Sequence, residues 1–248
     1  MSKIYQGIIL KVVPYKESDA IVTLLTKEEG FISFKARGVF KINSKNASSL
    51  QLYTIGEYKL ESKTDYSNKT LSSSSVVYFP IIVYDDLKYS SLLSFVSEVV
   101  LTNKENYEEI YDVLEYIIKN LDNLDLLTTS LVVLKYVLKW NGLLFEVNSC
   151  IGCQSKTVEV FSYEHGGFLC HKCNKTHTNI TNINYLKNIR IIIKANYNNV
   201  LSFKVDDVMG YKIFVDLVKY IENNLGTYYK TKEMLMMLIN NTDSRLTK

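Results

Sequence analysis

The sequence has only two prolines and no long apolar run. Pro14 and Pro80 both lie in the first third of the 248 residues, and the absence of proline from the remainder suits a helical second part. The longest apolar run, residues 76–84, contains one of these prolines and is far shorter than the ~20 residues that a membrane-spanning helix needs. We therefore expect no membrane span.

Histidines and nucleotide-binding motifs are also scarce. The only histidines are His165, His171 and His177, so a Ser/His/Asp triad or a histidine general base elsewhere in the chain is excluded. The sequence contains neither G-x-x-x-x-G-K-[ST] nor G-x-G-x-x-G, which argues against an ATP motor and against a Rossmann-type dinucleotide enzyme.

The composition is that of an ordered globular chain. Hydrophobic residues make up 47% and charged residues 22%, which provides enough apolar surface to offset the entropy of ordering. The first residues lack a basic stretch followed by an apolar one, so we expect no secretory signal and a cytoplasmic location. Disulfides are not expected in that compartment.

Positive charge is concentrated in the first part of the chain. Residues 1–80 hold eleven Lys and Arg against seven Asp and Glu, whereas residues 81–248 hold eighteen against nineteen. Residues 31–56 contain four cations and no acid: Lys35, Arg37, Lys41 and Lys45. Such a stretch can attract a polyanion, although a solvated lysine-rich face is the simpler interpretation of charge alone.

Apolar residues alternate with polar ones throughout the first 80 residues. Alternation with period two predicts strands, and five runs show it. These runs are residues 4–13, 20–26, 31–37, 50–60 and 71–79. Five short strands in ~80 residues predict a small antiparallel barrel of the OB type as the domain of residues 1–80.

From residue 85 onwards the apolar spacing becomes helical. Residues 126–145 are apolar nearly all round, which predicts the central helix of a bundle. Further helical patterns cover residues 183–195, 208–225 and 232–239. We therefore expect an α+β protein in which a helical domain, residues 81–147 and 180–248, is interrupted by a cysteine-rich insertion at residues 148–179.

All four cysteines lie in this insertion: Cys150, Cys153, Cys170 and Cys173. Two Cys-x2-Cys pairs separated by sixteen residues have the spacing of a zinc ribbon, in which each pair points two thiolates at one centre. Four thiolates leave no open position on the metal, so we expect one structural Zn²⁺. A redox dithiol or free thiols are the alternatives. The three histidines are expected to be exposed loop residues rather than ligands.

The basic stretch is predicted to begin on a strand. In residues 31–37, Ile32, Phe34 and Ala36 would face the core, while Lys35 and Arg37 would face outward. Lys41 and Lys45 would follow in the loop after Gly38. This pattern is typical of a barrel face that follows a phosphate backbone, so we take the four cations as candidate DNA contacts. Three aromatic residues could stack on bases or belong to the barrel core: Phe31, Phe40 and Tyr53.

At this point the motifs resemble a known family, the bacterial DNA repair and recombination mediator RecO. The matching segments are Gly7-Ile8-Ile9-Leu10-Lys11, Tyr15-Lys16-Glu17-Ser18-Asp19, Leu25-Thr26-x3-Gly30, Lys35-Ala36-Arg37-Gly38, Leu50-Gln51-Leu52 and Tyr229-Lys230-Thr231-Lys232. The four cysteines also lie where the family has them. Thr231 stands where serine is usual. Lysines replace most of the family's arginines, and because lysine acts as a point charge, bidentate phosphate contacts are not assigned.

The resemblance implies a DNA-binding mediator of repair and recombination that is not an enzyme. RecO-like proteins bind single- and double-stranded DNA through the OB domain and anneal complementary strands. They also act with RecR to load RecA on DNA coated by single-strand-binding protein. The resemblance therefore implies these partners, and a place at the nucleoid during repair.

Two other classes of function stay open. One is a zinc-ribbon scaffold for protein interactions that never binds DNA directly, which an absence of DNA binding at low salt would favour. The other is a Cys-x2-Cys oxidoreductase. Against the second stand the paired knuckles at zinc spacing and the lack of a thioredoxin-like βαβ pattern.

Overall fold

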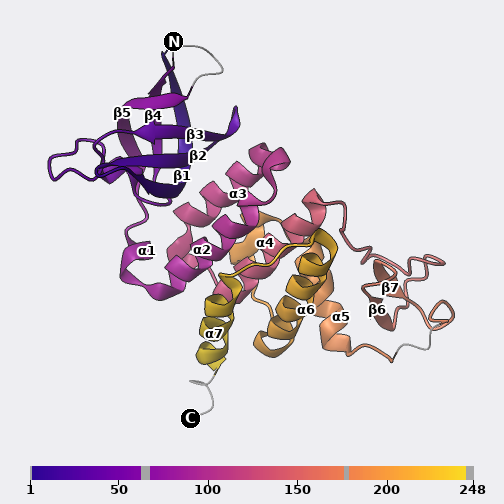
Figure 1. Cartoon of the computed structure of the whole chain (residues 1–248). Helices are drawn as coiled ribbons and strands as arrows, with labels where there is room; N and C mark the ends of the chain where they lie inside the picture. Colours follow the sequence, from indigo (N-terminus) through magenta and orange to yellow (C-terminus); the bar gives the residue numbers. More distant parts are fainter. Residues whose placement is uncertain (1, 63–67, 176–178, 244–248) are drawn as a thin grey trace. The chain divides into compact units, whose positions relative to one another are not determined.

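The computed structural model describes residues 2–62, 68–175 and 179–243 (Figure 1). The chain forms two compact units, which are described separately. The barrel unit consists of residues 1–93 and 100–122, and the helical unit consists of residues 94–99 and 123–248. The predicted domain boundaries of residues 1–80, 81–147 with 180–248, and 148–179 stay a prediction, but the barrel unit also takes in helical segments that follow the strands.

Five strands form a closed barrel in the order β1-β2-β3-β5-β4. The strands are β1 Ser2–Tyr15, β2 Asp19–Thr26, β3 Gly30–Ala36, β4 Ile55–Glu61 and β5 Lys69–Tyr78. All neighbouring strands are antiparallel except β3 and β5, which pair in parallel. This arrangement confirms the predicted five-stranded barrel. Closure leaves few backbone groups at an exposed sheet edge.

Alternate residues of the strands fill the barrel. On β3, Ile32, Phe34 and Ala36 are buried in the hydrophobic core, as predicted. Tyr58 of β4 is fully buried among them, and its hydroxyl donates to the carbonyl of Ser49 at 2.9 Å. The buried hydroxyl is therefore satisfied, as a polar group in an apolar core must be.

The fourth predicted strand was wrong at its beginning. Residues 48–50 form a short 3-10 helix, η1 Ser48–Leu50, and β4 starts only at Ile55. Leu50 is apolar because it enters the barrel core, not because it belongs to a strand. Tyr53 has a left-handed backbone, with φ of 66°, and its N–H donates to the carbonyl of Ile9 at 2.8 Å. Alternation of apolar residues does not distinguish a loop segment that inserts a side chain into the core, such as Leu50, from a strand.

Three helical segments complete the barrel unit. They are α1 Ile82–Asp85, the ends of α2 Leu87–Leu101 outside residues 94–99, and α3 Tyr107–Lys119, with 3-10 turns at Lys104–Asn106 and Leu121–Asn123. Helix α3 packs against β2 and β3. At Gly30, with φ of 68°, a β-carbon would lie 2.8 Å from the ring of Tyr107, so only glycine allows this close approach.

The helical unit is built around α4 Leu126–Trp140. Every residue of α4 from Leu126 to Leu138 is buried, which confirms the predicted central helix, although the helix ends at Trp140 and not at residue 145. Helices α5 Ile183–Lys194 and α6 Asp207–Leu225 pack against it, and α7 Lys232–Asp243 packs against α6. Between α4 and α5 the chain forms a small ribbon with the antiparallel strands β6 Val160–Ser162 and β7 Gly167–Leu169.

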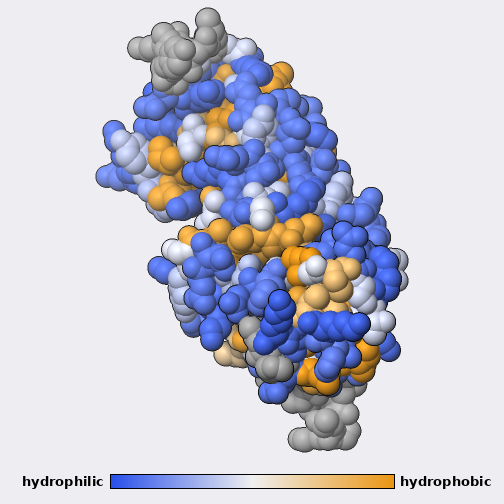
Figure 2. All heavy atoms as spheres, turned by 90° about the vertical axis from the view of Figure 1, so that its right-hand side faces the viewer, coloured by the Kyte–Doolittle hydropathy of each residue, from blue (hydrophilic) through white to orange (hydrophobic). Residues whose placement is uncertain are grey.

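The face of the molecule in Figure 2 is mainly hydrophilic, with hydrophobic side chains at separate places. The most exposed large ones in the helical unit are Ile180, Val208 and Ile183. Among the described residues, no helix combines the length and the apolar character needed to cross a membrane.

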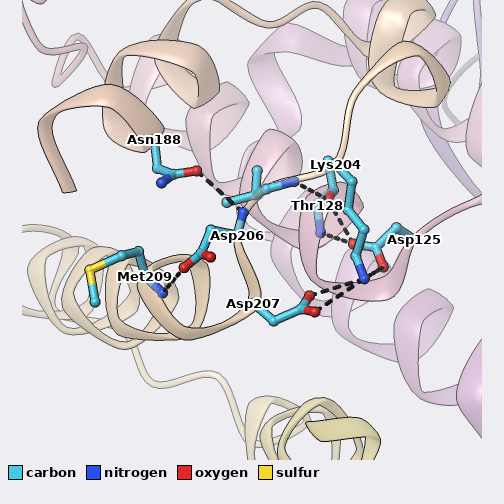
Figure 3. Close-up of polar contacts among 8 residues, drawn as sticks. Asp125, Thr128, Asn188, Lys204, Asp206, Asp207 and Met209 are labelled. Atoms are coloured by element: carbon cyan, nitrogen blue, oxygen red, sulfur yellow. Dashed lines mark hydrogen bonds and ion pairs between the residues drawn. The ribbon is translucent and has the colours of Figure 1, made fainter. Parts of the chain in front are cut away.

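Two aspartates cap the helices that meet beside α5. Asp125 precedes α4, and its Oδ1 accepts hydrogen bonds from Thr128 N at 2.8 Å and from Thr128 Oγ1 at 2.6 Å (Figure 3). Asp206 precedes α6 and accepts from Met209 N at 2.8 Å. Both caps satisfy N–H groups that the first helical turn leaves without an intrahelical partner.

The same residues connect the helices with one another. Thr128 Oγ1 accepts from Val205 N at 3.2 Å, and Asn188 Oδ1 of α5 accepts from Asp206 N at 3.3 Å. Lys204 Nζ lies 3.1 Å from Asp207 Oδ1 and 3.8 Å from Asp125 Oδ2 (Figure 3). Because these ion pairs are partly exposed, the cap of α4 contributes more to stability than the lysine does.

We expect Asp125→Ala to lower the free energy of unfolding by about 1 kcal/mol, because it removes a helix cap. Urea denaturation followed by circular dichroism measures the change. Asp122→Ala is the matched control, since Asp122 is exposed and caps no long helix. Equal stability of the two variants would show that the cap of α4 contributes nothing.

Candidate nucleic-acid interface and metal centre

The outer face of β1, β2 and β3 carries cations beside exposed apolar side chains. Residues directly opposite each other on paired strands point to the same face. The register places Lys11, Thr23 and Ser33 in one row and Val13, Ile21 and Lys35 in the next. Val13 and Ile21 are 41% and 36% exposed, so this row presents apolar surface beside Lys35.

Lys35 lies on this outer face, as predicted, but its charge is paired. Its Nζ lies 2.9 Å from Asp19 Oδ2 and 4.9 Å from the centre of the Tyr15 ring. Asp19 Oδ1 also accepts from Gly38 N at 2.8 Å. The hydrogen bond from Lys35, followed by that from Gly38, lowers the pKa of the Asp19 carboxyl. Asp19 therefore fixes the start of the loop after β3 and partly neutralises Lys35.

Arg37, Lys41 and Lys45 are exposed on that loop. Among the described residues, none of the three forms an ion pair. These three cations thus remain available to an external anion, whereas Lys35 is only partly so. The structure brings all four candidate DNA contacts onto β3 and the loop that follows it.

The loop is held in place at both ends. Phe40 N donates to Ser18 O at 3.0 Å, which joins the loop to the turn between β1 and β2. Ser74 Oγ of β5 donates to Asn46 Oδ1 at 3.0 Å, and it lies 2.6 Å from Ser49 Oγ. Anchors on two sides of Lys41 and next to Lys45 keep these cations in a defined position.

A groove opens between this loop and the segment after the barrel. We call it the barrel groove. It has a volume of about 350 Å³ and is lined by Val12, Pro14, Val39, Phe40, Ala47, Leu50, Gln51, Leu52 and Tyr84. Of the three aromatic residues considered for stacking, only Phe40 lines it, with 51% of its surface exposed, while Tyr53 is 5% exposed in the core. Tyr84 was missed, because it follows the barrel in sequence and only the fold brings it here.

The four cysteines come together in the ribbon. Their sulfur atoms all lie within 4.8 Å of one another, and Cys153 Sγ lies 3.5 Å from Cys170 Sγ. A disulfide needs sulfurs about 2.05 Å apart, and all four cysteines are free. Zinc–sulfur bonds of about 2.3 Å would place tetrahedral sulfurs about 3.8 Å apart, so the cluster is compatible with a zinc site.

The surroundings shift the pKa values of two of the four thiols in opposite directions. Burial raises the pKa of Cys150, but hydrogen bonds from the backbone at Cys170, Gly152 and Cys153 outweigh it and lower the pKa to about 6. The neighbouring sulfurs, Cys153 first, raise the pKa of Cys173 to about 12. Several thiolates this close repel one another, and a bound divalent cation would remove that repulsion.

The described histidines lie outside the sulfur cluster. His171 Nδ1 lies 3.3 Å from Glu159 Oε2, and His165 Nδ1 lies 2.9 Å from Ser162 Oγ. The cluster contains four cysteines and neither of these histidines. His177 lies outside the described residues.

Aromatic side chains join the ribbon to the helices. Phe145 contacts the rings of Phe161 and Tyr163 edge-on, with centroids 5.0 and 5.4 Å apart. Tyr185 of α5 lies within hydrogen-bond distance of Tyr163, at 2.7 Å, and donates to Asp216 of α6 at 3.0 Å. The candidate metal centre is therefore packed onto the bundle and is not a loose appendage.

The segment of residues 229–232 anchors α7. Glu98 accepts hydrogen bonds from the backbone N–H groups of Lys230 and Thr231 at 3.0 and 2.9 Å, and from the Thr231 hydroxyl at 2.5 Å. Lys232 Nζ lies 2.6 Å from Glu222, and both side chains are largely buried. Threonine keeps the hydroxyl that serine would supply, so the departure from the usual residue preserves this contact.

Comparison with known proteins assigns the family. A family model described as recombination protein O N terminal matches residues 1–79, and one described as recombination protein O C terminal matches residues 84–233. The chain belongs to the RecO family. The boundary between the two RecO matches falls directly after β5, where the barrel ends.

Curated relatives agree with this assignment. A protein of Halalkalibacterium halodurans named DNA repair protein RecO is 31% identical over 68% of this chain and 67% of its own length. The proteins of that name in Mesoplasma florum and Bacillus subtilis are 26% and 30% identical, and cover 93% and 68% of this chain and 89% and 67% of their own lengths. RecO membership places the chain among proteins of DNA repair and recombination.

We expect the carboxyl of Asp19 to titrate below its ordinary pKa of 3.8, and Lys35→Gln to move that pKa back toward 3.8. Because the folded pKa is lowered, the stabilisation from ionised Asp19 is present above pH 3.8 and is lost as the pH falls through the folded pKa. NMR titration of the carboxyl carbons measures the shift. Lys41→Gln, on the same loop, should leave the Asp19 pKa unchanged; an equal shift in both variants contradicts the pairing.

Proposed function

We propose that this protein is a DNA-binding recombination mediator that anneals complementary single strands in DNA repair. The observation that carries the proposal is the anchored loop of the barrel unit, on which Arg37, Lys41 and Lys45 are exposed and unpaired with any described acid. Membership of the RecO family supports it.

Annealing requires two polyanions to approach each other. Cations that displace counterions from phosphates reduce the repulsion between strands, without any covalent step. A point charge on a lysine holds a phosphate through less directional contacts than an arginine fork, so the hold can be exchanged between strands. The function therefore needs no nucleotide and no catalytic residue, and we propose that the protein is not an enzyme.

The further partners follow from the family resemblance. These are RecR, single-strand-binding protein and, indirectly, RecA. Residues 81–248 are nearly neutral, with eighteen basic and nineteen acidic residues, so this part is less suited to bind a polyanion than residues 1–80. We assign DNA contacts to residues 1–80 and protein contacts to residues 81–248. A protein with these ligands acts in the bacterial cytoplasm, at the nucleoid.

We also propose that the four cysteines hold one structural Zn²⁺. The donor set supports this, because four sulfurs within 4.8 Å of one another match a closed tetrahedral site better than a single dithiol. Gly152 supports it too, since a β-carbon there would lie 3.0 Å from Cys173 Sγ and would crowd the sulfurs. When bound, the metal stabilises the ribbon, which offers no open coordination position for chemistry.

We expect the protein to accelerate pairing of complementary labelled oligonucleotides without ATP, and less so as salt rises. Replacing Arg37, Lys41 and Lys45 together by Gln should reduce annealing. It should also reduce the magnitude of the slope of log affinity against log salt concentration by about 2 for single strands, because each lost phosphate contact lowers that slope by about 0.7. Lys35→Gln should have a smaller effect than any of these three, because Asp19 already pairs with Lys35.

The matched control loses the same charge elsewhere, by replacing the exposed residues Lys59, Lys187 and Lys194 with Gln. An unchanged salt slope in the loop variant, or an equal loss in the control, would place the DNA surface elsewhere. A strict requirement for ATP would contradict the absence of a nucleotide site. No DNA binding even at low salt would favour the protein scaffold.

We expect one zinc per chain in purified protein, released by a thiol-modifying reagent. Cys150→Ser should give unstable protein, because zinc binding contributes directly to folding free energy. His171→Ala should keep its zinc, since His171 lies outside the sulfur cluster. Elemental analysis with a thermal melt measures both. Fully stable wild-type protein without zinc would contradict the site.

A further inference from the structure

The barrel groove is an apolar depression formed by segments far apart in sequence. Pro14 comes from the end of β1, Phe40 from the loop after β3, and Tyr84 from α1. Phe40 and Tyr84 are 51% and 50% exposed, so both rings still present surface to a ligand. The volume of about 350 Å³ lies in the range of small-ligand sites, which is about 300–1,000 Å³.

Hydrogen bonds hold the backbone at Phe40 and the ring of Tyr84. Phe40 N donates to Ser18 O at 3.0 Å, and the Tyr84 hydroxyl donates to Leu52 O at 3.3 Å. The ring of Tyr84 also stacks on that of Phe79, with centroids 5.4 Å apart and planes 28° from parallel. The Tyr84 ring, held by these two contacts, can bind a flat ring without a large loss of its own side-chain entropy.

The charges beside the groove identify the kind of ligand. The loop that supplies Phe40 also carries Arg37, Lys41 and Lys45, which pair with no described acid. On the side of Tyr84 lie two exposed acids, Asp85 and Asp86. A polyanion is therefore attracted along one side of the groove only. A flat apolar ring attached to a phosphate backbone fits an apolar groove with cations along one side. An apolar protein segment would make no contact with the cations.

We propose that the barrel groove takes an unpaired base of single-stranded DNA between Phe40 and Tyr84, while the loop cations hold the adjoining phosphates. This site rests on the proposed DNA binding and adds a base subsite to it. Bases inside a duplex are stacked and paired, so they cannot enter the groove. The subsite thus makes the barrel bind single strands more tightly than duplex of the same charge density.

The test compares two strands that differ only in their bases. The wild-type protein is titrated with a short oligothymidine and with an abasic strand of equal length and charge. Loss of base stacking should make the abasic strand bind about tenfold or more weakly. Phe40→Ala and Tyr84→Ala should each bring this ratio toward one, with the affinity for the abasic strand, the affinity for duplex and the salt slope unchanged.

Two controls separate stacking from loss of fold. Tyr84→Phe keeps the ring and should keep the ratio. Ile4→Ala removes an exposed apolar side chain of the same barrel outside the groove and should also keep it. Thermal melts show whether each variant is folded.

The outcomes distinguish the base subsite from the proposed function. A wild-type ratio of one, or a ratio that both alanine variants leave unchanged, overturns the base subsite while salt-dependent DNA binding stands. A wild-type protein that binds neither strand overturns DNA binding, and the subsite with it. A ratio that falls in the alanine variants and persists in the controls supports the subsite.

Discussion

The barrel unit depends on the short parallel pairing of β3 with β5. Phe34 and Lys35 pair there with Lys69 and Thr70, and no other pair of strands in the barrel is parallel. Because β5 lies between β3 and β4 in the barrel, the chain cannot pass from β3 to β4 by a tight turn, and residues 37–54 form a long connection between them. That connection contains Leu50, whose side chain enters the barrel core, together with the loop cations and Phe40. Closure of the barrel therefore produces the anchored loop on which the proposed DNA contacts lie.

Local patterns predicted most of the fold. Alternation predicted the five-stranded barrel, helical spacing predicted α4 to α7, and the spacing of the cysteines predicted their convergence. Each of these signals repeats within a few residues, so it can be recognised without tertiary contacts. Residues 50–54 show where prediction from local pattern fails. A loop segment that is buried in the core and a buried strand have apolar residues at the same positions.

Less of the candidate site than of the fold could be predicted from the sequence. The four cations were recognised as an acid-free stretch, but the pairing of Lys35 with Asp19 depends on the register of β2 and β3. The groove was missed because Pro14, Phe40 and Tyr84 meet only after the barrel has closed and the chain has turned into α1. Sequence therefore predicts which charges exist, and the fold determines which remain free.

The packing of α3 on the barrel has a further consequence for charge. The turn between β2 and β3 is occupied by Lys27, paired with Asp112 of α3 at 2.8 Å, and by Glu29, paired with Lys3. Helix α3 also carries the exposed Glu108 in its first turn. The barrel unit thus carries cations without a described acidic partner on the loop after β3, whereas Lys27 at the turn between β2 and β3 is paired with an acid. Under the proposed DNA binding, a nucleic acid that approaches the barrel is attracted toward the loop after β3 rather than toward this turn.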